Sequence, residues 1–371
     1  MSGFGFYVHV PFCRARCDYC AFATWTDRDH LIGDYVDACV AEVQVAISEE
    51  ALPPASSIFF GGGTPSRLDG SQLGRILDAL PVEPGCEVTA ECNPEDATAD
   101  LFGRWRSAGV NRVSFGAQSM VPEVLVGLGR RHGIEAVQSA LRLAHDAGFA
   151  STSLDLIFGA ACETDSDWER TLGAVLALDP RPEHLSCYAL TVEPGTPLAS
   201  DPTRYPDEDS QARRYEKTDS LLEDAGFGWY EISNWSTPGH ECRHNRLYWD
   251  HGDYRGIGCA AHSHRGSRRF WNVRTPERYI SAVASGRKPT GGEELLDDDA
   301  CELERVSLMI RTRQGVPASW LPQDPSLEGL VETRGDRAIL TLRGRLLANE
   351  VILRIAGAPR VTAGQPGILR R

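Results

Sequence analysis

The sequence is poor in lysine, in methionine and in net positive charge. Only two of its 38 basic residues are lysines, Lys217 and Lys288, and it holds 3 methionines. Acidic residues number 52, which gives a formal net charge of −14 at pH 7. An acidic chain lacks the basic surface that non-specific binding to nucleic acid requires. We therefore expect no specific nucleic-acid partner, and we attribute the preference for arginine to coding composition.

Signals for export and for membrane insertion are missing as well. No run of about 18 apolar residues occurs, so no transmembrane helix is expected. The opening residues lack the basic region of a secretory signal peptide and are interrupted by Pro11. The sequence therefore predicts a cytoplasmic protein without a membrane span, and it leaves peripheral association with a membrane open.

Most of the 11 cysteines are scattered along the chain. In a reducing compartment, clustered cysteines bind metals or do chemistry more often than they form disulfides, whereas single ones behave as small hydrophobic residues. We expect eight of them to be buried in this way: Cys39, Cys86, Cys92, Cys162, Cys187, Cys242, Cys259 and Cys301.

The composition is that of a folded α/β protein. With 371 residues, 42% hydrophobic and 24% charged, the chain can form one large barrel and a small extra domain. Short apolar runs predict six strands: Phe6–Val10, Ser57–Phe60, Glu87–Glu91, Arg112–Gln118, Ser153–Phe158 and His184–Val192. Amphipathic stretches predict six helices between and after them: Leu31–Ile47, Gln72–Leu80, Asp100–Ala108, Ile134–Ala147, Asp167–Leu178 and Ala212–Ala225. Six βα units favour a partial (β/α)6 barrel of the TIM type, with a doubly wound sheet as the alternative.

The pattern changes twice further along the chain. Trp229–Trp235 is a candidate seventh strand, and residues 236–292, rich in Gly, His, Asn and aromatics, predict an irregular linking segment. From residue 293 a helix at Glu302–Arg311, a hairpin around Gly335 and a helix at Leu346–Ile355 predict a small winged-helix-like α+β domain. We therefore expect three parts, residues 1–235, 236–292 and 293–371.

The three remaining cysteines form a compact motif directly after the first predicted strand. Cys13, Cys17 and Cys20 have the spacing C-x3-C-x2-C. Three thiolates on one loop favour an iron–sulfur cluster with one iron free of protein ligands. Structural zinc, which normally takes four protein ligands, is the alternative, and His9 is the nearest candidate for a fourth ligand.

The stretch Tyr7–Phe22, which contains this motif, resembles the radical S-adenosylmethionine (SAM) superfamily. Within it, the sequence is most similar to the branch that holds the coproporphyrinogen III dehydrogenase HemN and the heme chaperone HemW. The resemblance covers most of the chain and implies a [4Fe-4S] cluster on Cys13, Cys17 and Cys20. It also implies that the open iron chelates the amino and carboxylate groups of SAM, with Tyr19 near the adenine.

The ends of the predicted strands carry the other candidate site residues, because barrel sites gather at the carboxyl ends of strands. Gly61-Gly62-Gly63-Thr64 is glycine-rich but is not followed by the Lys of a nucleotide-binding P-loop. The aspartate at 155 is costly inside an apolar strand unless it finds partners. The resemblance implies that the following residues contact SAM: Tyr7, Gly62, Gly63, Thr64, Glu91, Gln118, Arg130, Asp155 and Ala189. Arg130 is preferred to Arg131 for its spacing from Gln118.

Three features separate the chaperone branch from the dehydrogenases. The dehydrogenases carry a fourth cysteine where this sequence has Phe22, and they have a long extension ahead of the cluster. The string His244-Asn245-Arg246-Leu247-Tyr248-Trp249 resembles the heme-binding H-N-x-x-Y-W signature of the chaperones. The resemblance implies heme contacts from His244, Tyr248 and Trp249. The alternative is that these residues only pin a loop against the barrel.

Other residues compete for roles at the heme. Arg243 or Arg246 could pair with the propionates, and Cys242, His262 and His264 are rival axial ligands. The resemblance thus implies a chaperone that binds a [4Fe-4S] cluster, SAM and heme and passes heme to an acceptor hemoprotein. The alternatives are radical SAM oxidation of coproporphyrinogen III, which needs an electron donor, and a class C-type methyltransferase. No catalytic residue is assigned.

Overall fold

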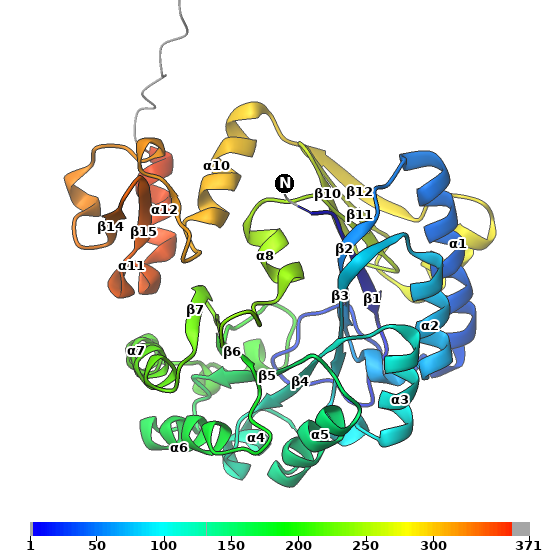
Figure 1. The fold of residues 1–371 in the computed structure, drawn as a ribbon, viewed down its shortest axis with the longest axis horizontal. Helices are drawn as coiled ribbons and strands as arrows, with labels where there is room; N and C mark the ends of the chain where they lie inside the picture. The colour runs from blue at the N-terminus through cyan, green and yellow to red at the C-terminus, as the bar shows by residue number, and fades with distance from the viewer. Residues whose placement is uncertain (1–2, 131, 358–371) are drawn as a thin grey trace, which may run out of the picture.

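A computed structural model describes residues 3–130 and 132–357 of the chain (Figure 1). Its first two thirds alternate strands and helices. The strands are β1 (Gly5–Val10), β2 (Ala55–Gly62), β3 (Val82–Cys92), β4 (Arg112–Gln118), β5 (Ser151–Phe158) and β6 (His184–Ala189). The helices are α1 (Ile32–Glu50), α2 (Gly70–Ala79), α3 (Ala99–Ala108), α4 (Pro122–Gly127), α5 (Ile134–Asp146), α6 (Asp165–Leu176) and α7 (Glu208–Asp224). The short helix α4 was not expected.

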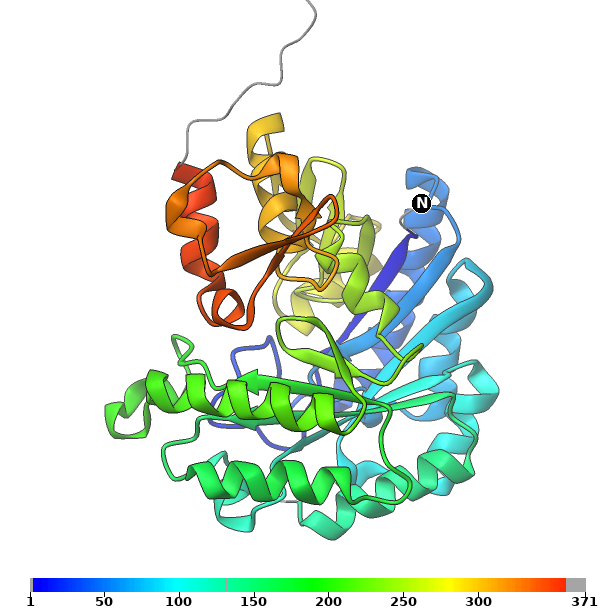
Figure 2. The same ribbon diagram turned by 60° about the vertical axis from the view of Figure 1, so that its left-hand side comes forward.

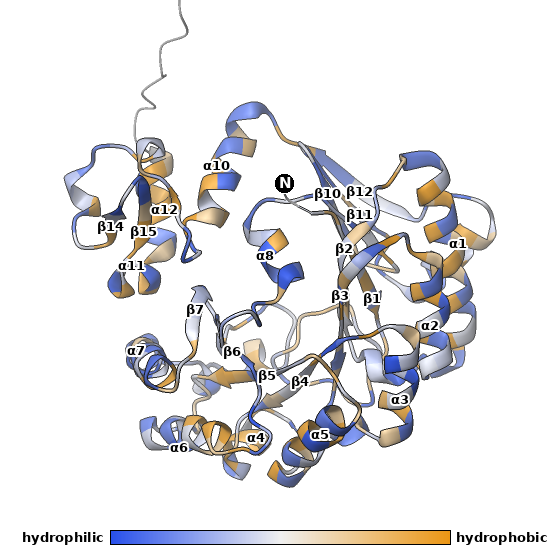
Figure 3. Cartoon of the chain, in the orientation of Figure 1, coloured by the Kyte–Doolittle hydropathy of each residue, from blue (hydrophilic) through white to orange (hydrophobic). Residues whose placement is uncertain are grey.

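The six strands form a parallel sheet in chain order, β1-β2-β3-β4-β5-β6. The sheet curves, and α1 to α7 cover its outer side (Figure 1). These helices carry both polar and apolar residues, as expected of helices packed on one face (Figure 3). Aromatic residues such as Trp105, Trp168 and Phe115 are fully buried in the resulting core. The predicted partial barrel is therefore confirmed, and the doubly wound alternative is wrong.

Residues 236–292 do not form an irregular segment, and that expectation is wrong. They contain α8 (Arg243–Trp249), β9 (Tyr254–Ile257), β10 (His262–Arg265), β11 (Arg268–Asn272), α9 (Pro276–Ala284) and the first half of β12 (Thr290–Leu295). β9 pairs in parallel with β1, and the other three strands continue the sheet as β12-β11-β10-β9. At the far edge the expected strand Trp229–Trp235 is a hairpin of β7 (Gly228–Glu231) and β8 (Asn234–Ser236). The sheet therefore extends beyond the barrel on both sides.

The last part of the chain forms a second, smaller core. It comprises α10 (Asp298–Met309), a sheet of β13 (Val316–Pro317), β14 (Val331–Arg334) and β15 (Arg337–Leu340), then α11 (Leu342–Leu346) and α12 (Ala348–Gly357). Ile310, Val316, Leu340 and Val351 are among its buried residues. This part lies against α7, which α11 contacts (Figure 2). The predicted small α+β unit is present.

Two further observations concern the scattered cysteines and the length of the helices. Six of the eight scattered cysteines are buried as expected, whereas Cys162 is exposed and Cys301 is half-buried. No helix of the described residues is long and apolar enough to cross a membrane.

Candidate functional site

The cysteine loop lies at the carboxyl ends of the parallel strands, beside a cavity of about 550 Å³. The loop follows β1 directly, so all three cysteines of the motif reach the cavity wall. Twelve of the residues predicted for the cluster and for SAM line this cavity: Cys13, Cys17, Tyr19, Cys20, Gly62, Gly63, Thr64, Glu91, Gln118, Arg130, Asp155 and Ala189. Tyr7 lies deeper and lines a second, inner cavity. Arg131 lies outside the described residues.

The three thiols share a wall but do not converge on one point. All three are free, and among the described residues no group of three His, Cys, Asp or Glu side chains is close enough to hold a metal ion. Three thiolates suit an iron–sulfur cube, which binds each one at a different corner, whereas structural zinc normally takes four protein ligands.

A chain of hydrogen bonds connects two of the cysteines through polar side chains. Arg130 donates to Cys17 Sγ at 3.3 Å and to Asn93 Oδ1 at 3.0 Å. Asn93 in turn donates to the Thr64 hydroxyl, which donates to Cys13 Sγ at 3.5 Å. Sequence reasoning missed Asn93, although it follows Glu91 closely at the end of β3. Donors of this kind stabilise thiolate ligands, so the geometry suits a bound cluster.

His9 is not a fourth ligand in this structure. Its Nε2 lies 2.9 Å from the Ala23 carbonyl and its Nδ1 lies 3.2 Å from the Tyr7 hydroxyl. The ring is buried, which lowers the pKa of His9 to about 4. His9 instead fastens the end of the cysteine loop to β1.

The turn after β2 requires glycine because a side chain there would clash with β1 and with the cysteine loop. Gly62 has φ 106°, a conformation that favours glycine, and a Cβ there would lie 2.3 Å from the ring of His9. At Gly63 a Cβ would lie 2.7 Å from the Val10 carbonyl oxygen and 3.1 Å from Cys13 Sγ. The glycines therefore let the turn approach the cysteine loop closely.

The end of β4 is strained and crowded by two predicted SAM residues. Gln118 is buried with φ 63°, which is rare for a residue other than glycine and typical of functional sites. A Cβ at Gly116 would lie 2.8 Å from the Gln118 side-chain amide and 3.3 Å from the Arg130 guanidinium. Gly116 thus makes room for both side chains at the cavity wall.

Two carboxyl groups give the cavity its electrostatic character. Burial, and secondarily the charge of Asp155, raise the pKa of Glu91 to about 8. Burial also raises the pKa of Asp155, which accepts hydrogen bonds from the Ser114 hydroxyl at 3.1 Å. The charges of Arg112 and Arg130 offset the shift of Asp155 only in part, so this wall favours a ligand with positive charge or several hydroxyl donors.

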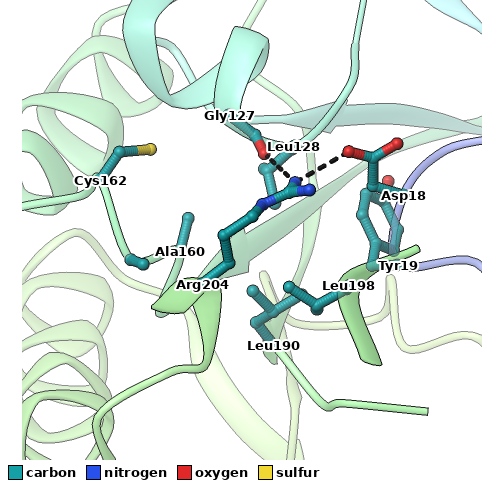
Figure 4. A pocket seen from close by; sticks show the side chains of 10 residues that line it. Asp18, Tyr19, Gly127, Leu128, Ala160, Cys162, Leu190, Leu198 and Arg204 are labelled. Atoms are coloured by element: carbon teal, nitrogen blue, oxygen red, sulfur yellow. Dashed lines mark hydrogen bonds and ion pairs between the residues drawn. The ribbon is translucent and has the colours of Figure 1, made fainter. Parts of the chain in front are cut away.

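The far side of the cysteine loop is fastened by the segment that follows β6. Arg204 donates to Asp18 at 2.8 Å and to the Gly127 carbonyl at 2.9 Å (Figure 4). The Leu198 amide donates to the Asp18 carbonyl at 3.0 Å. These contacts frame a side cavity of about 260 Å³, and Tyr19 lies between it and the main cavity. Sequence reasoning missed Asp18 and Arg204, which are far apart in the chain.

The predicted heme residues lie at the other end of the barrel, on α8. His244 is 1% exposed; its Nδ1 lies 3.0 Å from the Ser57 hydroxyl and its Nε2 lies 2.8 Å from the Tyr248 hydroxyl. His244 and Tyr248 line the inner cavity, whereas Trp249, at the end of α8, does not. Burial lowers the pKa of His244 to about 3. In this conformation the motif closes the barrel, with both imidazole nitrogens engaged.

The structure also places the residues that the sequence offered as alternative heme contacts. Arg246 pairs with Glu241, whereas Arg243 is exposed and donates from Nη1 to the Gly85 carbonyl. Cys242 is buried and donates to Glu87. His262 and His264 lie on β10 and do not line the inner cavity. Phe22, at the position of the dehydrogenases' fourth cysteine, is 65% exposed at the rim of the main cavity.

Comparison with known proteins agrees with this arrangement. The sequence model of the radical SAM superfamily matches residues 7–175, which span β1 to α6. The structure is similar to that of coproporphyrinogen III oxidase (HemN) from Escherichia coli, with a TM-score of 0.82, 23% identity and coverage of 96% of this chain and 90% of that one. At this identity the likeness shows the fold alone. The sequence match identifies residues 7–175 as a radical SAM domain.

Relatives in sequence show which family of radical SAM proteins the chain belongs to. The chain is 42% identical to the heme chaperone HemW of Mycobacterium tuberculosis over 95% of each chain. It is 32% identical to HemW of Bacillus subtilis, over 93% of this chain and 97% of the relative. It is 37% identical to HemW of Escherichia coli, over 77% and 74%. The chain belongs to the HemW family.

Proposed function

We propose that this protein is a heme chaperone that holds a [4Fe-4S] cluster, binds SAM, carries heme and passes it to an acceptor hemoprotein. The observation that supports this most is 42% identity along 95% of the chain to a protein named as a heme chaperone. The cavity at the strand ends, lined by the three motif cysteines, adds independent support.

Cys13, Cys17 and Cys20 would hold the cluster, and the residues around them fit it. The relay of Thr64, Asn93 and Arg130 supplies hydrogen bonds to the sulfurs. Burial raises the pKa of the Cys13 and Cys20 thiols, so binding iron releases their protons. With an open iron, the cluster would supply a coordination site for the amino acid end of SAM.

The rest of the main cavity would hold SAM. Glu91 and Asp155 face the space where a cationic group or ribose hydroxyls find acceptors, and Gln118 offers both a donor and an acceptor. Tyr19 supplies a flat ring beside the cysteines, and its neighbours Leu190 and Ile157 are apolar. These residues bind and orient the ligand, and none is assigned a chemical step.

Heme binding is expected at α8, through His244 and Tyr248 with Trp249 at the end of the helix. Histidine is a common axial heme ligand. The Tyr248 hydroxyl occupies Nε2 of His244, so coordination there requires this hydrogen bond to break. The structure therefore predicts that heme binding is slowed by the closed position of α8.

Hemin titration followed by the Soret band tests this assignment. We expect His244→Ala to weaken binding at least about tenfold, because a protein–iron bond is lost. Tyr248→Phe keeps the ring and removes the hydroxyl, so we expect faster binding than in the unchanged protein. His145→Ala, at an exposed histidine on α5, is the control. Equal binding by His244→Ala and His145→Ala would contradict the site, and conversion of coproporphyrinogen III would favour the dehydrogenase instead.

A further inference from the structure

The interior of the barrel differs from a packed hydrophobic core. A barrel of this type is normally filled by branched apolar side chains. Here the inward positions hold polar residues around an inner cavity of about 130 Å³. The residues that carry the argument are Thr89, Glu91, Arg112, Asp155 and His244. The cavity shares Glu91, Asp155 and Tyr188 with the main cavity, so the two spaces adjoin.

Arg112, at the start of β4, is the unusual group in this cavity. It is 3% exposed, and its Nη1 donates to the Ser151 hydroxyl at 2.7 Å and to the His240 carbonyl at 3.0 Å. Its Nη2 has no hydrogen-bond partner, and no acidic side chain of the described residues forms an ion pair with it. The charge of Arg112 lowers the pKa of Asp155, but no ion pair joins the two side chains, so Nη2 still lacks an acceptor. A buried donor without an acceptor is costly, so the position calls for a ligand oxygen.

A second unpartnered donor stands next to it. The buried hydroxyl of Thr89 also has no hydrogen-bond partner, and Thr89 is the register neighbour of Arg112 across β3 and β4. Two adjacent donors, one of them cationic, match the two oxygens of a carboxylate. The volume admits a carboxylate group with a short chain.

The other charged groups that face the cavity are compatible with an anion at Arg112. Asp155 is already hydrogen-bonded by Ser114, and burial raises the pKa of Glu91 to about 8, which keeps it protonated at neutral pH. His184 is neutral because burial lowers its pKa, and its two nitrogens contact Ser153 and Tyr230. Arg112 is therefore the one fixed cation among the described groups that line this cavity.

We propose that the inner cavity is a carboxylate site in which Arg112 and Thr89 bind one carboxylate group. Its source is either a small free carboxylate or one propionate of the heme. The second source rests on the proposed function and uses the fact that His244 lines the same cavity. Arg243 and Arg246, the arginines expected at the propionates from sequence, do not line this cavity, and Arg246 is paired with Glu241.

Thermal unfolding with formate as the probe tests the site independently of heme. We expect formate to raise the Tm of the protein by about 2–5 °C at saturation, since it binds only the folded chain. The shift should vanish in Arg112→Met and shrink in Thr89→Val, which keeps the shape of Thr89. Arg75→Gln, at an exposed arginine paired with Asp37, is the control for salt effects. Equal shifts in all variants, or none in the unchanged protein, would count against a free-carboxylate site.

Titration with hemin and with hemin dimethyl ester distinguishes the two sources. If the site takes a propionate, hemin binds at least about tenfold more tightly than the ester, and Arg112→Met removes the difference. If it takes a free carboxylate, the formate shift remains while hemin and ester bind alike. The proposal is overturned when neither the formate shift nor the preference for hemin depends on Arg112.

Discussion

Buried ionisable residues at the main cavity lower the stability of the empty protein. Glu91 shows this most clearly, because burial raises its pKa to about 8. The folded chain therefore holds a proton that the unfolded chain releases at lower pH. For a carboxyl group whose pKa is raised on folding, stability falls as the pH rises between the unfolded and folded pKa values.

We therefore expect Glu91→Gln to stabilise the SAM-free protein above pH 8 and to have little effect near pH 5. The Tm difference between variant and unchanged protein should grow by a few degrees over this range. Thermal unfolding at pH 5–9 measures it. SAM affinity, in contrast, should fall in the variant. A Tm difference that does not vary with pH would contradict the burial of an ionisable Glu91.

Sequence reasoning found the site residues at the ends of strands. It did not find the residues that join distant parts of the site through hydrogen bonds. Gly63, Glu91 and Asp155 could be predicted because parallel strands bring their carboxyl ends together. Asn93 and Arg204 could not, since their roles depend on partners elsewhere in the chain, such as Arg130 and Asp18. Contacts between residues so far apart in the chain leave no local pattern in the sequence.

Among the elements, α1 holds the extension of the sheet through one buried carboxylate. Glu42 accepts from Arg255 at 3.2 Å, from Asn272 at 2.8 Å and from Tyr279 at 2.7 Å. It also accepts from the Gly258 amide at 2.9 Å. These partners come from β9, β11, α9 and the loop after β9, so one side chain fixes several parts of residues 236–292 to the barrel.

We expect Glu42→Ala to lower the free energy of unfolding by about 3–5 kcal/mol, because it leaves the buried Arg255 short of a counter-charge. Glu49→Ala, on the same helix, removes an exposed ion pair with Lys288 and should cost less than about 1 kcal/mol. Urea unfolding of both variants gives the comparison. Similar losses would show that Glu42 does not organise the extension.

The first six strands could be predicted and the extension could not, for a physical reason. β1 to β6 are apolar runs separated by amphipathic helices, so each has its own signal. β10 and β11 consist of His, Ser, Arg and aromatic residues and gain their stability from pairing along the edge next to β9 and β1. Strand pairing in the folded protein therefore outweighs the local sequence pattern, which predicted an irregular segment.

At the scale of the whole molecule, one buried arginine is among the contacts that join the C-terminal unit to the barrel. Arg345, on α11, is buried and forms an ion pair with Asp219 of α7. Its guanidinium also lies 4.3 Å from the centre of the Trp229 ring and 5.6 Å from that of Tyr215. The C-terminal core is separate from the barrel core, so docking depends on contacts of this kind.

We expect Arg345→Ala to loosen this docking while the barrel stays folded. Limited proteolysis with mass spectrometry should then show faster cleavage near residues 298–357, by about tenfold or more, given the loss of a buried ion pair. Arg343→Ala, at an exposed arginine of the same helix, is the control. Equal cleavage rates in the two variants would show that Arg345 does not hold the unit.

The proposed function requires that the loop after β1 binds an iron–sulfur cube through three cysteines and leaves one iron for SAM. Mössbauer spectroscopy of protein reconstituted anaerobically with ⁵⁷Fe tests it most directly. We predict about four irons per chain, with one whose signal changes when SAM is added, and loss of the cluster in Cys17→Ser but not in Cys301→Ser. A spectrum without such a cluster, or one that SAM leaves unchanged, would contradict the account.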